Sequence, residues 1–168
     1  MREAGKVTGQ ILRELKDVIK PGISTMDIDQ YVERRVKDFG MIASEKGYCG
    51  FPGSVCTSVN EVVVHGIPSE SCILNEGDIV SVDLVVEYKG YMADACRTYA
   101  VGEISPEAQH LIDTAEAAFF EGMKYAKIGN RLGDISNAIQ QKVESEGFGV
   151  IREFVGHGIG KDMHEEPQ

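Results

Sequence analysis

Residues 79–101 read IVSVDLVVEYKGYMADACRTYAV, and this stretch decides how the chain can fold. Its two halves, 79–87 and 91–101, are rich in Val, Ile, Tyr and Thr, which favour β-strands. The short sequence YKG at 88–90 separates them, as expected for the tight turn of an antiparallel hairpin. The sequence therefore predicts a β-hairpin over 79–101.

Asp83 and Asp94 each interrupt an otherwise apolar strand of this hairpin. An unpaired carboxylate in such a place is costly, so something must compensate both charges. A turn at 88–89 would place the aspartates directly opposite each other, and a turn at 89–90 would make them diagonal neighbours; in both registers they share one face. Two carboxylates about 5 Å apart favour a bridging divalent cation. The alternative is an exposed hairpin face with both aspartates in water.

Helical patterns lie on both sides of the hairpin. Four segments carry apolar residues at helical spacing, namely 3–20, 24–40, 108–127 and 132–146. Ser24 and Asp27 have the spacing of a capping box at the start of the second. Three further segments have the composition of strands, namely 55–59, 62–67 and 149–155. The resulting order is helix, helix, strands, helix, helix, strand, which predicts an α+β fold.

This order suggests an internal duplication. Sliding the chain along itself by 107 positions places Asp27 on Asp134 and Gly40 on Gly147. We expect a single, incomplete domain over 1–168, with a first repeat over about 1–104 and a partial second repeat over about 105–168. A second copy of the hairpin would fall beyond Gln168. The alternative is that the two segments are unrelated helical hairpins, which share only the glycines at their turns and helix ends.

Composition excludes several classes of partner. The 168 residues are 42% apolar and 26% charged, as in a soluble globular domain. A net charge of −10 argues against binding to nucleic acid or to an anionic membrane. No segment approaches the roughly 18 apolar residues of a membrane span, and 1–20 lacks the apolar run of a signal peptide. We therefore expect a cytoplasmic protein.

The cysteines form no CxxC pair of the zinc-finger or thioredoxin type. We expect four reduced thiols that pack as small apolar side chains, at Cys49, Cys56, Cys72 and Cys96.

Three histidines stand in glycine-rich or strand-breaking contexts. His65 lies in VVVHGIP, His157 in GHGIG and His164 in HEEPQ, whereas His110 lies in an ordinary polar helical stretch. Flanking glycines allow backbone and ligand to approach closely. Together with the aspartate pair, these histidines predict a functional site.

Three motifs in order resemble the type I methionine aminopeptidases of the M24 metallopeptidases. They are SVNEVVVHGIP at 58–68, SVDLVVEYKGYMADACRTY at 81–99 and VGHGIGKDMHEEPQ at 155–168, and the similarity runs over the whole chain. The resemblance implies the pita-bread fold, with two related αβ halves around a pseudo-twofold axis and a curved antiparallel sheet. The second half would be incomplete in 168 residues.

The resemblance also implies a centre of two divalent ions, such as Co, Mn, Fe or Zn. Asp83 would ligate one ion, Asp94 would bridge both, and His157 would ligate the other. His65 would meet the substrate near the scissile bond, and His164 would stabilise the oxyanion. Two further ligands of the family are glutamates that lie downstream of HEEPQ, so the 168-residue chain is expected to be inactive by itself.

Further binding residues follow from the same resemblance. The pocket for the methionine side chain would be lined by Tyr48, Phe51, Cys56 and Met163. The main-chain carbonyls of Asn60 and Val62 would form a monovalent-cation site.

The implied function is removal of the initiator methionine from nascent chains whose second residue is small. The substrate would be the N-terminal peptide of a nascent chain, which the enzyme would bind at the ribosome. The whole enzyme would be a monomer. An Xaa-Pro aminopeptidase or prolidase is one alternative. The stretch VNEVVVHGIP, together with Phe51 and Cys56, argues against it. The other is a pita-bread module that binds peptides without catalysis.

Overall fold

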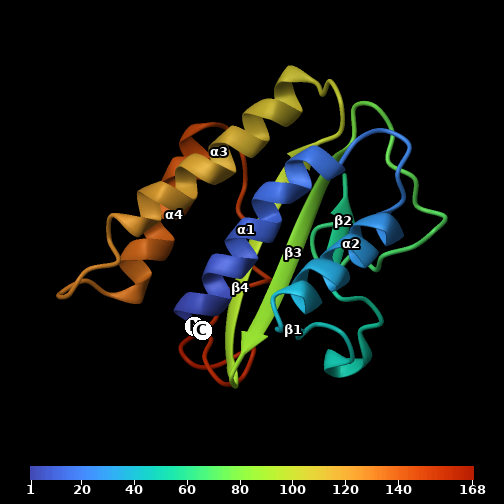
Figure 1. Ribbon diagram of the computed structural model, residues 1–168. Helices are drawn as coiled ribbons and strands as arrows, with labels where there is room; N and C mark the ends of the chain where they lie inside the picture. The colour runs from blue at the N-terminus through green and yellow to red at the C-terminus, as the bar shows by residue number, and fades with distance from the viewer. The chain divides into compact units, whose positions relative to one another are not determined.

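The computed structural model describes all residues from Met1 to Gln168. They form two compact units, one of Met1–Ile104 with Gly156–Gln168 and one of Ser105–Val155. The first unit contains seven elements (Figure 1): α1 (Arg2–Val18), α2 (Thr25–Asp38), β1 (Ile42–Ala43), the 3-10 helix η1 (Tyr48–Gly50), β2 (Cys56–Val59), β3 (Ile79–Tyr88) and β4 (Tyr91–Ala100). No helix of the chain is both long and apolar enough to cross a lipid bilayer.

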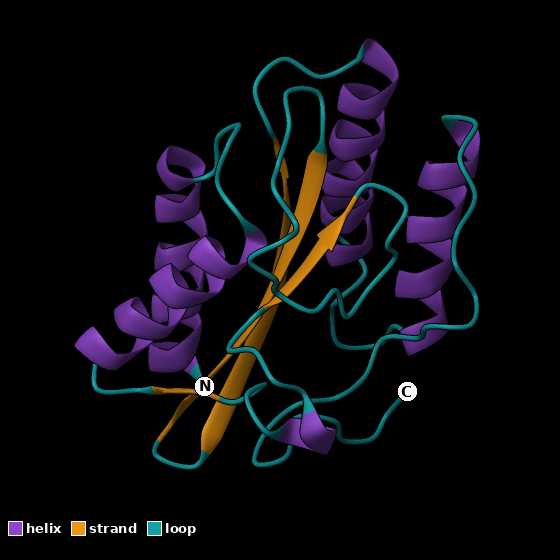
Figure 2. Ribbon diagram, turned by 90° about the vertical axis from the view of Figure 1, so that its right-hand side faces the viewer, coloured by secondary structure: helices purple, strands orange, loops and turns teal.

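The predicted hairpin belongs to a four-stranded antiparallel sheet in which β3 is the central strand (Figure 2). Strand β3 pairs with β4 along its whole length, and with β1 and β2 on its other side. The turn is Lys89–Gly90, with φ of 54° and 75°, so both turn residues adopt the left-handed conformation of a type I′ hairpin. Of the two registers that the sequence allows, the structure has the one in which Asp83 and Asp94 are diagonal neighbours.

One face of the sheet carries the hydrophobic core. Alternate residues of β3 are fully buried among the apolar residues of α1 and α2, namely Val80, Val82, Leu84 and Val86. Figure 1 shows α1 and α2 lying along this face. Because side chains alternate along a strand, Ser81, Asp83 and Val85 lie on the opposite face. The core thus fixes which face of the hairpin is left for chemistry.

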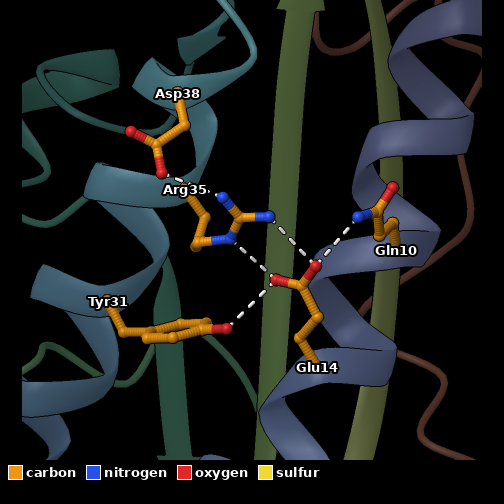
Figure 3. A network of polar contacts seen from close by, with 5 residues as sticks. All are labelled: Gln10, Glu14, Tyr31, Arg35 and Asp38. Carbon is orange, nitrogen blue, oxygen red and sulfur yellow. Dashed lines mark hydrogen bonds and ion pairs between the residues drawn. The ribbon is translucent and has the colours of Figure 1, made fainter.

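A polar network joins the two helices that cover the core (Figure 3). Glu14 of α1 accepts hydrogen bonds from the Arg35 guanidinium at 2.8 and 3.1 Å and from the Tyr31 hydroxyl at 3.0 Å. Gln10 donates to the same carboxylate, and Asp38 binds the other side of Arg35 at 2.9 Å. These contacts, led by Arg35, lower the pKa of Glu14 to about 2.

Replacing Glu14 by Gln should lower the free energy of unfolding by about 1 kcal/mol at pH 7, because a partly solvated, multiply bonded ion pair is lost. The folded-state pKa of Glu14 lies below its ordinary value of 4.5, so this contribution is present above pH 4.5 and is lost as the pH falls toward about 2. Urea unfolding at pH 7 and at low pH measures it. Glu3→Gln, at an ion pair whose side chains are 59% and 66% exposed, should change little at either pH.

The second unit is a helical hairpin of α3 (Pro106–Met123) and α4 (Leu132–Ser145). Ser105 caps α3, with Pro106 at its first position, and the Asp134 carboxylate accepts from the Arg131 amide at 2.7 Å. Helices α2 and α4 have the same length and begin 107 positions apart. The duplication itself stays a prediction.

Two predicted strands are wrong. Residues 62–67 form no strand, because His65 has a φ of 58° and the segment makes isolated hydrogen bonds to β2 in place of a ladder. The Gly66 carbonyl accepts from the Thr57 amide at 2.8 Å, and the Gly66 amide donates to the Ser58 hydroxyl at 3.1 Å. Residues 149–155 have strand-like composition but pair with no other strand, and without a hydrogen-bonded partner a single strand does not form.

The four thiols are free, as predicted, but they do not all pack as apolar residues. Cys56 is buried and Cys72 is half-buried, whereas Cys49 and Cys96 are exposed. Cys49 lies in η1, and Cys96 lies on β4, which pairs with β3 alone and so leaves its other edge open.

Candidate active site

Asp83 and Asp94 come together on the sheet face opposite α1 and α2. Asp83 is half-buried on β3, and the side chain of Asp94 on β4 is 24% exposed. The two carboxyl groups are within hydrogen-bonding contact. Burial, followed by the negative charge of Asp83, raises the pKa of Asp94 to about 7. Two carboxylates so placed repel each other unless a proton or a cation lies between them.

Two thiols flank Asp83 in a row across three strands. The register pairs Asp83 with Cys56 of β2 on one side and with Cys96 of β4 on the other. Burial, then the nearby carboxylates, raises the pKa of the Cys56 thiol. Cys56 is therefore protonated at neutral pH, and it lies beside Asp83 as a neutral, weakly polar group.

Glu45 is a site residue that sequence reasoning missed. It follows β1, is only 6% exposed, and has side-chain contact with the Cys56 thiol. Its Oε2 atom has no hydrogen-bond partner. Burial is the main cause that raises the pKa of Glu45 to about 8, and the charges of Asp83 and Asp94 add to it. No sequence signal marks this residue, because SEKG at 44–47 has the composition of an exposed polar turn.

The segment 156–168 brings two histidines to the aspartates. The Gly160 carbonyl accepts from the Met92 amide on β4 at 2.8 Å, which attaches the segment to the open edge of the sheet. Gly158 and Glu165 then form an antiparallel bridge, with both hydrogen bonds 2.8 Å long. As a result the rings of His157 and His164 lie 4.3 Å apart, although seven residues separate them.

His157 is oriented toward Asp94. Its Nδ1 lies 2.9 Å from the Gly158 carbonyl oxygen, which can only accept, so Nδ1 carries the proton. Its Nε2 therefore presents a lone pair in the neutral ring, and this atom lies 3.7 Å from Asp94 Oδ2. A backbone carbonyl on one ring nitrogen is the usual way in which a ligating histidine is held.

His164 and His65 complete the cluster. The Tyr48 hydroxyl lies 2.8 Å from Nδ1 of His164. Burial lowers the pKa of His164, and the positive charges of the neighbouring His157 and His65 lower it further. His65 therefore lies near His164. Gly66 fixes the position of His65: a Cβ there would come within 2.2 Å of the Thr57 carbonyl oxygen.

Gly158→Ala should lower activity by at least about tenfold, because a Cβ at 158 would lie 2.4 Å from the Glu166 carbonyl oxygen and would open the bridge that holds His157 and His164 together. Activity assays and thermal unfolding measure the effect. Gly156→Ala is the matched control, since a Cβ there meets no atom within 4 Å. Equal activity of the two variants would contradict the assigned role of the bridge.

The remaining residues predicted from sequence lie in the same unit. Met163 is buried directly before His164, and Phe51 is half-buried directly after η1. Asn60 lies in the turn after β2, where its side chain donates to Asp78 at 2.8 Å and accepts from the Ile79 amide. Asn60 and Val62 therefore lie near the start of β3, apart from the aspartate pair.

The donors present suit divalent metal ions. The structure places no three His, Cys, Asp or Glu side chains in position to ligate one ion. However, two carboxyl groups in contact and an imidazole whose free Nε2 faces one of them form an oxygen and nitrogen donor set typical of Mn, Fe, Co or Zn. A cation among these groups would also remove the repulsion between Asp83 and Asp94.

Comparison with known proteins gives one consistent result. The sequence matches metallopeptidase family M24 over residues 1–168. It is 54% identical to a methionine aminopeptidase of Clostridium acetobutylicum and 51% identical to methionine aminopeptidase 1 of Bacillus subtilis. Both matches cover all of this chain and 67% of the relative, so the chain spans about two thirds of their length.

Solved structures agree with the sequence matches. The structure of a methionine aminopeptidase from Thermotoga maritima superimposes with a TM-score of 0.98 and 43% identity, over 100% of this chain and 68% of the other. An X-Pro aminopeptidase from the same organism has a TM-score of 0.79 at 23% identity, over 98% of this chain and 46% of the other, which shows a shared fold alone. The predicted α+β pita-bread fold is confirmed, with the chain covering part of it.

Proposed function

Because the chain belongs to metallopeptidase family M24 and matches methionine aminopeptidases over its whole length, we propose that the protein carrying it removes initiator methionine. Its substrates would be new polypeptides whose second residue is small. The observation that carries this proposal is that Asp83 and Asp94 are in contact on one face of the hairpin, with His157 Nε2 3.7 Å from Asp94.

Asp83, Asp94 and His157 would hold two divalent ions, with Asp94 shared because it contacts both of the others. Bound there, such ions activate a water molecule and stabilise the charge that develops on the scissile carbonyl. His164 would donate a hydrogen bond to that oxygen, and His65 would contact the substrate beside the scissile bond.

The methionine side chain would bind among Tyr48, Phe51, Cys56 and Met163. A protonated thiol, two aromatic rings and a thioether suit an unbranched apolar side chain and exclude a charged one. The main-chain carbonyls of Asn60 and Val62 would bind a monovalent cation. The partner is the N-terminal peptide of a nascent chain, in the cytoplasm and at the ribosome, and the enzyme would act as a monomer. The net charge of −10 argues against a nucleic-acid or membrane partner.

The decisive test uses the whole natural protein that carries this chain, supplied with divalent metal. Incubation with a Met-Ala-Ser peptide should release free methionine, and a peptide with an Xaa-Pro amino terminus should be a poor substrate. Equal release from the Xaa-Pro peptide would move the assignment to the prolidases and X-Pro aminopeptidases. Peptide binding without any release would indicate a non-catalytic module.

The 168 residues alone should not bind two metal ions tightly. They carry three of the five protein ligands that the family resemblance implies, and affinity falls steeply when ligands are missing. Isothermal calorimetry with Mn²⁺ or Co²⁺ measures this directly. Tight binding of two ions per chain would contradict the expectation, and would show that Asp83, Asp94 and His157 suffice.

A further inference from the structure

We propose that Tyr48 is a positioning residue, whose hydroxyl group donates to Nδ1 of His164 and so fixes the proton of that imidazole on Nε2. The proposal deepens the function proposed above, because it explains how His164 is made a hydrogen-bond donor. Tyr48 is otherwise expected only to line the side-chain pocket.

The ring of His164 contacts both Tyr48 and His157. The Tyr48 oxygen lies 2.8 Å from Nδ1, which is a normal hydrogen-bonding distance. The Tyr48 ring centroid lies 5.4 Å from that of His164 at an interplanar angle of 33°. The ring of His157 lies 4.3 Å from that of His164, at an interplanar angle of 50°. His164 therefore contacts two rings, and its Nδ1 is engaged by the Tyr48 hydroxyl.

Both ends of this contact are anchored to the backbone. Tyr48 begins η1, where its amide donates to the Glu45 carbonyl at 3.0 Å and its carbonyl accepts from Phe51 at 2.9 Å. His164 precedes Glu165, whose amide and carbonyl both bond to Gly158. The hydrogen bond thus links two segments 116 residues apart in the chain.

The direction of the hydrogen bond decides what His164 can do. In a neutral imidazole one nitrogen is a donor and the other an acceptor, and the partner of one sets the state of the other. A phenol hydroxyl donates more strongly than it accepts, so Nδ1 is the acceptor and Nε2 carries the proton. The Nε2–H group is then the donor that a developing oxyanion requires. With the opposite tautomer, Nε2 would present a lone pair and would repel that oxygen.

The tautomer can be measured without any assay of activity. We would record ¹⁵N chemical shifts of the histidine rings in the whole natural protein at pH 8, comparing wild type, Tyr48→Phe and Tyr125→Phe. Wild type and Tyr125→Phe should show His164 with a protonated Nε2 and an unprotonated Nδ1. In Tyr48→Phe the two tautomers should be mixed. A wild-type ring protonated on Nδ1, or an unchanged ring in Tyr48→Phe, would overturn the proposal.

Kinetics separate positioning from pocket lining. Tyr48→Phe keeps the ring and its apolar surface, so KM for a Met-Ala-Ser peptide should change little while kcat falls by at least about tenfold. A rise in KM with unchanged kcat would show that Tyr48 acts only in the pocket, against the proposal. The ¹⁵N chemical shifts report the tautomer of His164 whatever reaction the protein catalyses. A failure of the proposed role of Tyr48 can therefore be distinguished from a failure of the proposed function.

Discussion

Replacing Asp94 by Asn in the whole natural protein should lower kcat/KM for a Met-Ala-Ser peptide by at least about a thousandfold. Asp94 contacts Asp83 and lies 3.7 Å from His157 Nε2, so it is the one proposed metal ligand that is close to both of the others. The Asn amide has the same shape, but it is uncharged and has a single oxygen that is only a weak metal ligand. It therefore cannot bridge two cations. Calorimetry with Mn²⁺ should show a matching loss of metal affinity.

A control variant and a stability measurement show whether the effect of Asp94→Asn is specific to catalysis. Glu87→Gln alters a carboxylate on the same face of β3, four residues from Asp83, and should leave activity nearly unchanged. In the metal-free protein, Asp94→Asn removes one of two neighbouring negative charges and should not lower the unfolding temperature. Wild-type activity in Asp94→Asn would show that the reaction does not use this carboxylate. A large fall in its unfolding temperature would show that Asp94 is structural.

The second large effect is a dependence of stability on pH that arises from Glu45. Burial raises its folded-state pKa to about 8, against an ordinary value of 4.5. Between these values the folded chain holds a proton that the unfolded chain has released, so stability falls as the pH rises from 4.5 through about 8. The slope should approach about 1.4 kcal/mol per pH unit, and the loss over this range amounts to several kcal/mol.

Glu45→Gln should lower the slope by up to about 1.4 kcal/mol per pH unit, because an amide cannot ionise and keeps the shape of the side chain. The part of the slope below about pH 7 that arises from Asp94 should remain. Urea unfolding at several pH values between 5 and 8, with a chelator present, measures the slope in each variant. Glu61→Gln, at an exposed position of the same unit, should retain the wild-type slope. If wild type and Glu45→Gln have the same slope, Glu45 is ionised in the folded protein.

The helices and the hairpin could be predicted because their signals are local. Helical spacing, the Ser24–Asp27 capping box and the β-prone halves around Lys89–Gly90 all depend on residues near one another in the chain, and all are found in the structure. Strand 62–67 was predicted by the same reasoning and is wrong, because contact with β2, rather than composition, sets the conformation of His65 and Gly66.

The sequence by itself determined that Asp83 and Asp94 share one face of a hairpin, because side chains alternate with a period of two in either register. Only the tertiary structure decided that they are diagonal neighbours, since the choice between two adjacent turns depends on backbone conformations at Lys89 and Gly90. The tertiary structure alone also placed Glu45 beside Cys56 and the Tyr48 hydroxyl on His164. These contacts join segments far apart in the chain, and burial and proximity there are set by the packing of the whole unit, for which no spacing within the sequence is a signal.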